Sequence, residues 1–347
     1  MSDALSPHPA ALGSRSARAR LLNSPAETVL VVAARKCGWV AAPNRANSTL
    51  RRRGLISAAL AAMTGFVGTG LAGCASVPRP PEPWEARLRG STIALLGEVH
   101  DNPEHHRRRA ALLRRAVEAG WRPALVMEQF DIDRQADIER SRRERPRDAK
   151  HLIAQAGAPG GWAWHDYEPL LDIALQFDLK LFAANLPRAL AARLVRETPQ
   201  AVFGTPRSRE LGLDALPDAA WQAAQEREID LGHCGALPQR LWAGLARGQF
   251  ARDAVMAEVL LREGANGAVL LAGNGHVRRD IGVPRWLTAQ PNGSVLAVGF
   301  LESDRRSSER PPERLPFDAV VFTPAALRDD PCKAFKARPL PQAGVQT

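Results

Sequence analysis

Residues 92–106 have the sequence TIALLGEVHDNPEHH, in which a short apolar run gives way at once to polar residues. The run predicts a buried strand, and the polar pair before Pro103 predicts the start of a helix. Glu98 and His100 lie where the strand ends. Ligands of open α/β sheets bind at the carboxyl ends of the strands, so both side chains are candidate site residues.

The rest of the chain alternates apolar, strand-like runs with segments of helical periodicity. This pattern predicts an α/β fold with a largely parallel sheet flanked by helices on both faces. The stretch 189–261 is mostly helical and too long for one crossover, which indicates a helical subdomain or lid. The expected strands are 92–96, 123–127, 180–184, 268–272, 295–301 and 319–322, and the first two helices are expected at 103–119 and 131–145.

Three further strand ends carry polar side chains, namely Glu128, Asn185 and His276. Parallel strands would bring them to the same edge of the sheet as Glu98 and His100. Two histidines with two carboxylates would suit an acid–base site or a divalent metal ion. Glu98, His100, Glu128 and His276 are therefore the catalytic candidates, and Glu98, His100 and His276 are the candidate metal ligands. The alternative is that these residues only cap the following helices.

Residues 162–167, WAWHDY, form an aromatic segment that suits a planar apolar ligand. Trp162, Trp164, His165 and Tyr167 are its candidate ligand-binding residues. Tyr167 is the only tyrosine of the chain, and tyrosine is a known axial ligand of haem iron. The alternative is an aromatic plug in the core, since aromatic side chains dominate cores.

Three polar pairs have simpler interpretations. Residues 105–106 (His-His), followed by three arginines, predict a solvated helix face that is basic enough to meet haem propionates. Residues 252–253 (Arg-Asp) predict an exposed pair on a helix. Residues 233–234 (His-Cys) are possible metal ligands but lack the spacing of a structural zinc site. Cys234 and Cys332 either pair in an oxidising compartment or remain two thiols.

The net charge of +10 is concentrated at the N-terminus. The first 53 residues hold nine basic and two acidic side chains, which accounts for +7. The remaining +3 makes the body of the protein only mildly basic, which argues against a role in nucleic-acid binding.

Residues 51–73 predict an export signal, because three arginines precede an uncharged stretch of small apolar residues. The sequence LAGC at 71–74 resembles a lipobox, which implies a lipid anchor on Cys74 and a periplasm-facing place in the cell envelope. An uncleaved membrane anchor is the alternative. The expected divisions are a poorly structured extension over 1–50, the signal over 51–73, a Pro-rich tether over 74–88, the main domain over 89–325 and a tail over 326–347.

Taken together, these features resemble the ChaN family of haem-binding lipoproteins, in the wider grouping with the Tiki and erythromycin-esterase-like proteins. The matching segments, in the order of the family, are LLGEVHDNPEHH (95–106), VMEQFD (126–131), WAWHDYEPLL (162–171), LFAANLPR (181–188), HC (233–234), QFARDAVMAEVL (249–260) and LLAGNGHVRRDIGVP (270–284).

The resemblance implies a lipid-anchored protein of haem or iron uptake. It implies non-covalent b-type haem, held between two subunits with the iron bound by a tyrosine, and Tyr167 lies in the matching segment. A homodimer formed on haem binding and an outer-membrane haem receptor or transporter are the implied partners. In the wider grouping, positions related to Glu98, His100 and His276 serve metal-dependent hydrolysis, so a hydrolase is the alternative function.

Overall fold

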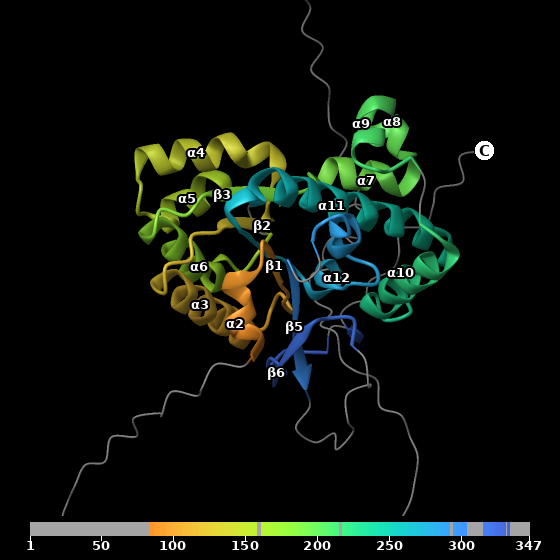
Figure 1. Cartoon of the computed structure of the whole chain (residues 1–347). Coiled ribbons are helices and arrows are strands. Elements are labelled where there is room, and N and C mark those ends of the chain that lie inside the picture. Colours follow the sequence, from red (N-terminus) through yellow and green to blue (C-terminus); the bar gives the residue numbers. More distant parts are fainter. Residues whose placement is uncertain are drawn as a thin grey trace, which may run out of the picture.

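The computed structural model describes residues 83–157, 161–214, 217–291, 294–303, 315–330 and 332–333. Their centre is a six-stranded sheet of order β3-β2-β4-β1-β5-β6, in which every neighbouring pair is parallel (Figure 1). The predicted parallel α/β fold is therefore confirmed. The strands are β1 (Ile93–Leu96), β2 (Ala124–Asp131), β3 (Leu181–Asn185), β4 (Ala268–Leu271), β5 (Val295–Ser303) and β6 (Ala319–Pro324).

Helices cover both faces of the sheet, because successive strand residues point to opposite sides. Leu96 and Met127 belong to the core beneath the first group of helices. Leu95 and Val126, their neighbours in the chain, belong to the core beneath the long helix α11 (Trp242–Glu263). The first group comprises α2 (Pro83–Gly90), α3 (Pro103–Glu118), α4 (Gln135–Glu144), α5 (Ala149–Ala156) and α6 (Trp164–Gln176).

The segment expected to form a helical subdomain is helical and has a core of its own, in which Trp221 and Phe250 pack edge to face. Helix α11 is continuous where the sequence predicts two helices. Gly244 makes this possible, since a Cβ there would collide with the backbone of Val195 on the neighbouring helix. The other helices of this segment are α7 (Arg188–Arg196), α8 (Pro199–Phe203), α9 (Thr205–Glu210) and α10 (Ala219–Gly232).

Two element boundaries differ from expectation in ways that affect the site. Strand β2 continues to Asp131, so Glu128 lies within the strand rather than after it. The aromatic segment opens helix α6, whose first residue is Trp164. Tyr167 therefore faces the sheet from the first turn of a helix.

Cys234 and Cys332, which the sequence left open, form a disulfide with a Cα–Cα distance of 5.5 Å. It ties the chain after β6 to the end of α10. The expected export signal, the anchor residue Cys74 and the tether up to residue 82 lie outside the described residues. Within the described ranges, no helix combines the length and apolar character that a membrane span requires.

Candidate functional site

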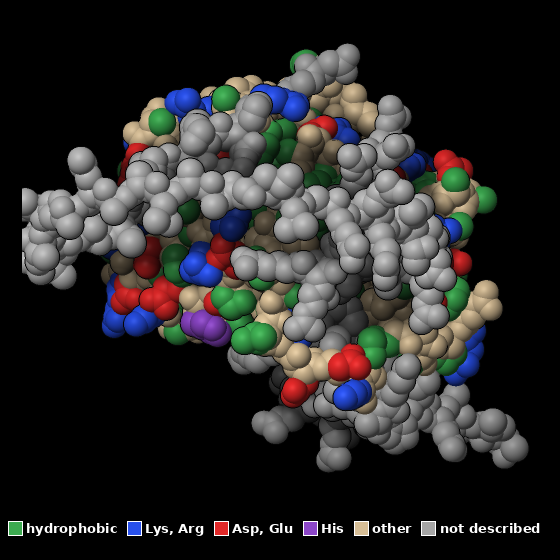
Figure 2. Space-filling view, turned by 90° about the horizontal axis from the view of Figure 1, so that it is seen from below, with side chains coloured by type: hydrophobic (Ala, Val, Ile, Leu, Met, Phe, Trp, Pro, Cys, Tyr) green, Lys and Arg blue, Asp and Glu red, His purple; other side chains and the backbone are tan. Residues whose placement is uncertain are grey.

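The strand order places the ends of β1, β2 and β4 side by side, because β4 pairs with both of the others. These ends form the lower side of the molecule, to which β5 points in Figure 1. Figure 2 shows this side from below, with acidic, basic and hydrophobic side chains intermingled. The polar side chains at these strand ends form two buried clusters, one around Glu98 and one around Glu128.

The Glu98 cluster holds a fully buried carboxylate. The Tyr167 hydroxyl donates a 2.6 Å hydrogen bond to its Oε1, and the Gln129 amide donates another at 3.3 Å. His100 Nδ1 lies 2.6 Å from the same oxygen. The Arg109 guanidinium forms an ion pair with Oε2, and neither side chain is exposed. Glu98 is thus held by one cation and several neutral donors.

His106 completes this cluster from helix α3. Its Nδ1 lies 3.5 Å from Glu98 Oε2 and 3.0 Å from an Arg109 nitrogen, and its Nε2 lies 2.9 Å from the His100 carbonyl oxygen. Its ring packs edge to face on Tyr167, with centroids 4.5 Å apart. Burial lowers the pKa of His106 and lowers that of Arg109 to about 10, so near neutral pH His106 is neutral and Arg109 is charged.

The Glu128 cluster links β2, β4 and α11. Glu128 Oε2 accepts a 2.7 Å hydrogen bond from the Gly273 backbone N–H, and its Oε1 lies 3.5 Å from His276 Nε2. His276 Nδ1 lies 2.5 Å from Asp253 Oδ1. The imidazole therefore lies between two carboxylates.

These contacts set the charges of the second cluster. Burial by itself lowers the pKa of His276, but the Glu128 and Asp253 carboxylates raise it to about 10. Burial raises the pKa of Asp253 to about 6, although His276 limits the rise. Burial also opposes ionisation of Glu128, yet His276 and His100 hold its pKa well below the usual range. At neutral pH an imidazolium lies between two carboxylates.

His100 lies between the two clusters. A Cβ at position 273 would come within 2.9 Å of the His100 ring and 3.7 Å of Glu128 Oε2, so Gly273 leaves the space that the imidazole occupies. The ring packs edge to face on Trp162, with centroids 4.8 Å apart. Its side chain is 19% exposed, while that of its partner Glu98 is fully buried. His100 thus carries the Glu98 cluster toward the surface.

The fourth strand end joins the Glu128 cluster indirectly. Asn185 donates a 2.8 Å hydrogen bond to Asp131 and accepts another from Arg252. Arg252 precedes Asp253 on α11, and both residues face the sheet edge. The prediction of an exposed Arg252–Asp253 pair is wrong, because Asp253 is only 2% exposed and is bonded to His276.

Two other expectations are corrected by the packing. His105 and His106 are buried, not solvated, because this side of α3 faces the strand ends. His105 Nδ1 accepts a hydrogen bond from the Val99 N–H, and its Nε2 lies 2.7 Å from the Thr323 hydroxyl. Neither histidine is therefore open to haem propionates. Cys234 is oxidised in the disulfide, so the His233–Cys234 pair offers no thiolate to a metal.

The candidate metal ligands do not surround one point. Among the described residues, no group of three or more His, Cys, Asp or Glu side chains could hold a metal ion. Glu98 is paired with Arg109, and His276 lies between two carboxylates. A protonated imidazole donates from both nitrogens and has no lone pair for a metal. The arrangement is that of paired acids and bases.

The aromatic segment presents residues of very different exposure. Tyr167 is fully buried, whereas the His165 side chain is 80% exposed. Trp162 and Trp164 are half-buried and pack against the same core, and the Trp164 ring lies 5.0 Å from that of Phe130. Burial raises the pKa of Tyr167, so its phenol stays protonated. As a donor set for haem iron, this segment fits an exposed imidazole and does not fit a phenolate.

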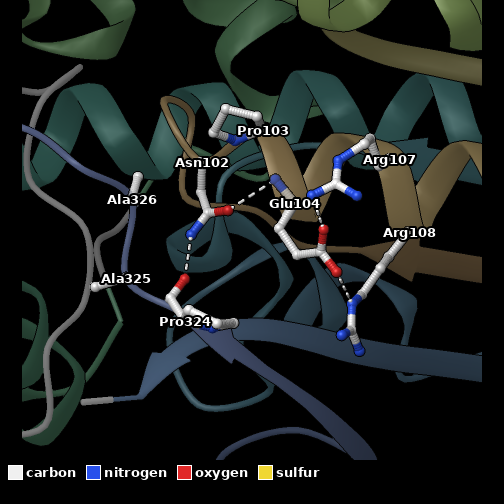
Figure 3. Close-up of a pocket in the computed structure, with 8 residues that line it drawn as sticks. All are labelled: Asn102, Pro103, Glu104, Arg107, Arg108, Pro324, Ala325 and Ala326. Atoms are coloured by element: carbon white, nitrogen blue, oxygen red, sulfur yellow. Dashed lines mark hydrogen bonds and ion pairs between the residues drawn. The ribbon is translucent and has the colours of Figure 1, made fainter. Parts of the chain in front are cut away.

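A pocket of about 400 Å³ lies at the start of α3, against the chain after β6 (Figure 3). Glu104 lies between the guanidinium groups of Arg107 and Arg108 and pairs with both. Asn102 accepts a hydrogen bond from the Glu104 N–H and donates one to the Pro324 carbonyl. None of the residues that line the pocket belongs to the Glu98 or Glu128 cluster.

The sequence missed Arg109, His106, Asp253 and Gln129 as members of these clusters. For α3, helical spacing carries a signal, since His106, Arg109 and Leu113 share one side of the helix and Leu113 is fully buried. Gln129 and Asp253 carry no comparable signal, because their partners are distant in the chain.

Comparisons with known proteins agree with the architecture. A family model described as haem-binding uptake, Tiki superfamily, ChaN matches residues 84–287. A structure of cofacial haem binding to ChaN of Campylobacter jejuni has a TM-score of 0.51 and 20% identity, covering 62% of this chain and 84% of that one. The mutant erythromycin esterase EreC in its open conformation gives 0.39 and 15%, covering 62% and 71%. The type III effector HopBA1 gives 0.38 and 13%, covering 72% and 97%.

No curated protein sequence matches the chain significantly. The family model, however, spans more than half of the chain and includes both clusters and the aromatic segment. The protein therefore belongs to the ChaN family of haem-binding uptake proteins in the Tiki superfamily.

Proposed function

We propose that the protein binds haem non-covalently and acts in haem or iron uptake. The observation that carries the proposal is the family match over residues 84–287. The segment from Trp162 to Tyr167 is the proposed contact for the macrocycle, because it combines half-buried tryptophans with an exposed imidazole. Haem iron needs an axial ligand such as His or Tyr, and both residue types occur in this segment.

The proposal includes a homodimer that forms when haem binds. Cofacial haem binding to ChaN of Campylobacter jejuni supports this part. A haem receptor or transporter in the outer membrane is the proposed partner. Export and lipid anchoring at Cys74 are also part of the proposal, and the Cys234–Cys332 disulfide supports export, since disulfides persist in oxidising compartments.

A haemin titration followed by absorbance and by size-exclusion chromatography tests binding and dimerisation together. We expect saturable binding and a shift from monomer to dimer as haemin is added. The same titration with His151→Ala is a control, because His151 is a distant histidine whose side chain is 14% exposed and paired with Glu144. Absence of saturable binding would end the haem proposal, and binding without a size shift would remove only the dimer.

Acid–base hydrolysis is a second candidate, favoured by the contact between Glu98 and His100. A buried carboxylate 2.6 Å from Nδ1 of a partly exposed histidine is the arrangement that orients a general base. Glu128 and His276 would supply a second carboxylate and an acid, and a divalent ion would supply Lewis acidity in the metal-dependent form.

Ester and amide screens of the wild type, His100→Ala and His151→Ala test this candidate, with and without added Mn²⁺ or Zn²⁺. Hydrolysis lost only in His100→Ala would support it. A wild type that shows no turnover above buffer, or an active His100→Ala variant, would rule it out.

A further inference from the structure

Tyr167 is unsuited to the role that its family resemblance implies. It is the only tyrosine in the chain and has no exposed surface. Its hydroxyl donates to Glu98 at 2.6 Å, and three aromatic rings surround its own at centroid distances of 4.5 to 6.0 Å. Iron ligation would require the phenol to leave a buried carboxylate, lose its proton and reach a macrocycle outside the core.

Other side chains that ligate haem iron are His, Met and Cys. Among the described residues, Met127 and Met256 are fully buried, and both cysteines are in the disulfide. Most histidines are also enclosed: the side chains of His100, His151 and His276 are 19%, 14% and 11% exposed. His165, at 80%, is the one such residue in this part of the chain with a largely exposed side chain.

The surroundings of His165 also suit a ligand. It lies between Trp162 and Trp164 on one side and Asp166 on the other, at the first turn of α6. Asp166 Oδ1 lies 3.5 Å from His165 Nε2. Ligating histidines commonly donate their second ring N–H to a carboxylate, which fixes the tautomer. The half-buried tryptophans offer apolar surface beside the imidazole.

We propose that His165 holds the iron of bound haem and that Tyr167 instead fixes the Glu98 carboxylate. This proposal rests on the proposed haem-binding function and departs from it only in the ligand. It assigns the exposed and the buried ends of one short segment to different tasks.

Ferric haemin binding to the full chain tests the proposal, with absorbance and electron paramagnetic resonance as readouts. The wild type, Tyr167→Phe and the control His151→Ala should give the same imidazole-type spectrum. His165→Ala should lose that spectrum and bind haemin at least about tenfold more weakly, since even outer-shell partners of metal ligands contribute 10–100-fold. His165→Tyr should acquire a phenolate charge-transfer band, which appears only if the iron lies at this position.

The outcomes separate the ligand from the function. A wild type that binds no haemin would overturn both proposals. A wild type with a phenolate band would overturn the ligand assignment alone, as would an unchanged spectrum in His165→Ala. Because the wild-type spectrum decides this point by itself, the test does not depend on Tyr167→Phe remaining folded.

Discussion

The Tyr167 hydroxyl and Oε1 of Glu98 are 2.6 Å apart, and both side chains are buried between helix α6 and the end of β1. This hydrogen bond joins the aromatic segment to the strand-end motif across 69 positions of the chain. A charged acceptor makes it one of the stronger hydrogen bonds of the molecule.

Tyr167→Phe should lower the free energy of unfolding by about 1–3 kcal/mol, because Glu98 loses a donor without gaining water. Urea unfolding monitored by circular dichroism measures the change. In a Glu98→Gln background the same substitution should cost less, since the acceptor is then neutral. Equal costs in the two backgrounds would show that the phenol contributes packing rather than the hydrogen bond.

Arg109→Met should be more destabilising, by about 3–5 kcal/mol, because it leaves the Glu98 carboxylate buried without its cation. Arg115→Met on the same helix is the matched control. Arg115 is 58% exposed and pairs with Glu85 at the surface, so its loss should cost less than about 1 kcal/mol. The double variant Glu98→Gln/Arg109→Met should recover part of the lost stability. Similar effects of the two arginine substitutions would contradict a special role for the buried pair.

The sequence predicts which residues lie at the strand ends because apolar runs and their polar termini are local features. Glu98, Glu128 and His276 were found in this way. The contacts between them depend on the strand order, which puts β4 between β1 and β2 and is not encoded in any local pattern. Hence the sequence indicates one mixed site, whereas the structure divides these residues into two clusters.

The charged residues on helices were harder to place. Arg109 lies in a run of three arginines that is typical of a solvated surface, and only its partner Glu98 explains why it is buried. Asp253 likewise depends on His276, 23 positions away. Residue type alone also suggested Tyr167 as an iron ligand, since its burial depends on the packing of α6 on the sheet. A single sequence does not specify such pairings.

The His276 pair predicts a pH dependence above neutrality. The pKa of His276 is raised from 6.5 to about 10, so its contribution to stability is complete below pH 6.5 and is lost as the pH rises through about 10. The free energy of unfolding should therefore fall by at least about 2 kcal/mol between pH 7 and pH 10. Asp253 acts with the opposite sign, but its raised pKa of about 6 confines that effect to lower pH.

Urea midpoints across this pH range measure the dependence, and Asp253→Asn is the matched variant. Loss of one carboxylate should lower the pKa of His276, so the fall in stability should begin at a lower pH than in the wild type. Superimposable pH profiles for the two proteins would show that Asp253 does not hold the proton on His276.

The Cys234–Cys332 disulfide closes a loop with a sequence separation of 98, so its removal should cost about 2–5 kcal/mol. The segment that it fixes carries Arg328, which binds Glu302 with contacts of 2.5 and 2.7 Å and lies 2.9 Å from Asp101. Cys234→Ala/Cys332→Ala should therefore unfold at lower urea and expose the chain after β6 to proteases. Reductant should produce the same loss in the wild type and none in the double variant. A wild type whose unfolding midpoint is insensitive to reductant would mean that the two thiols are not paired in solution, and the support that the disulfide gives to export would disappear with it.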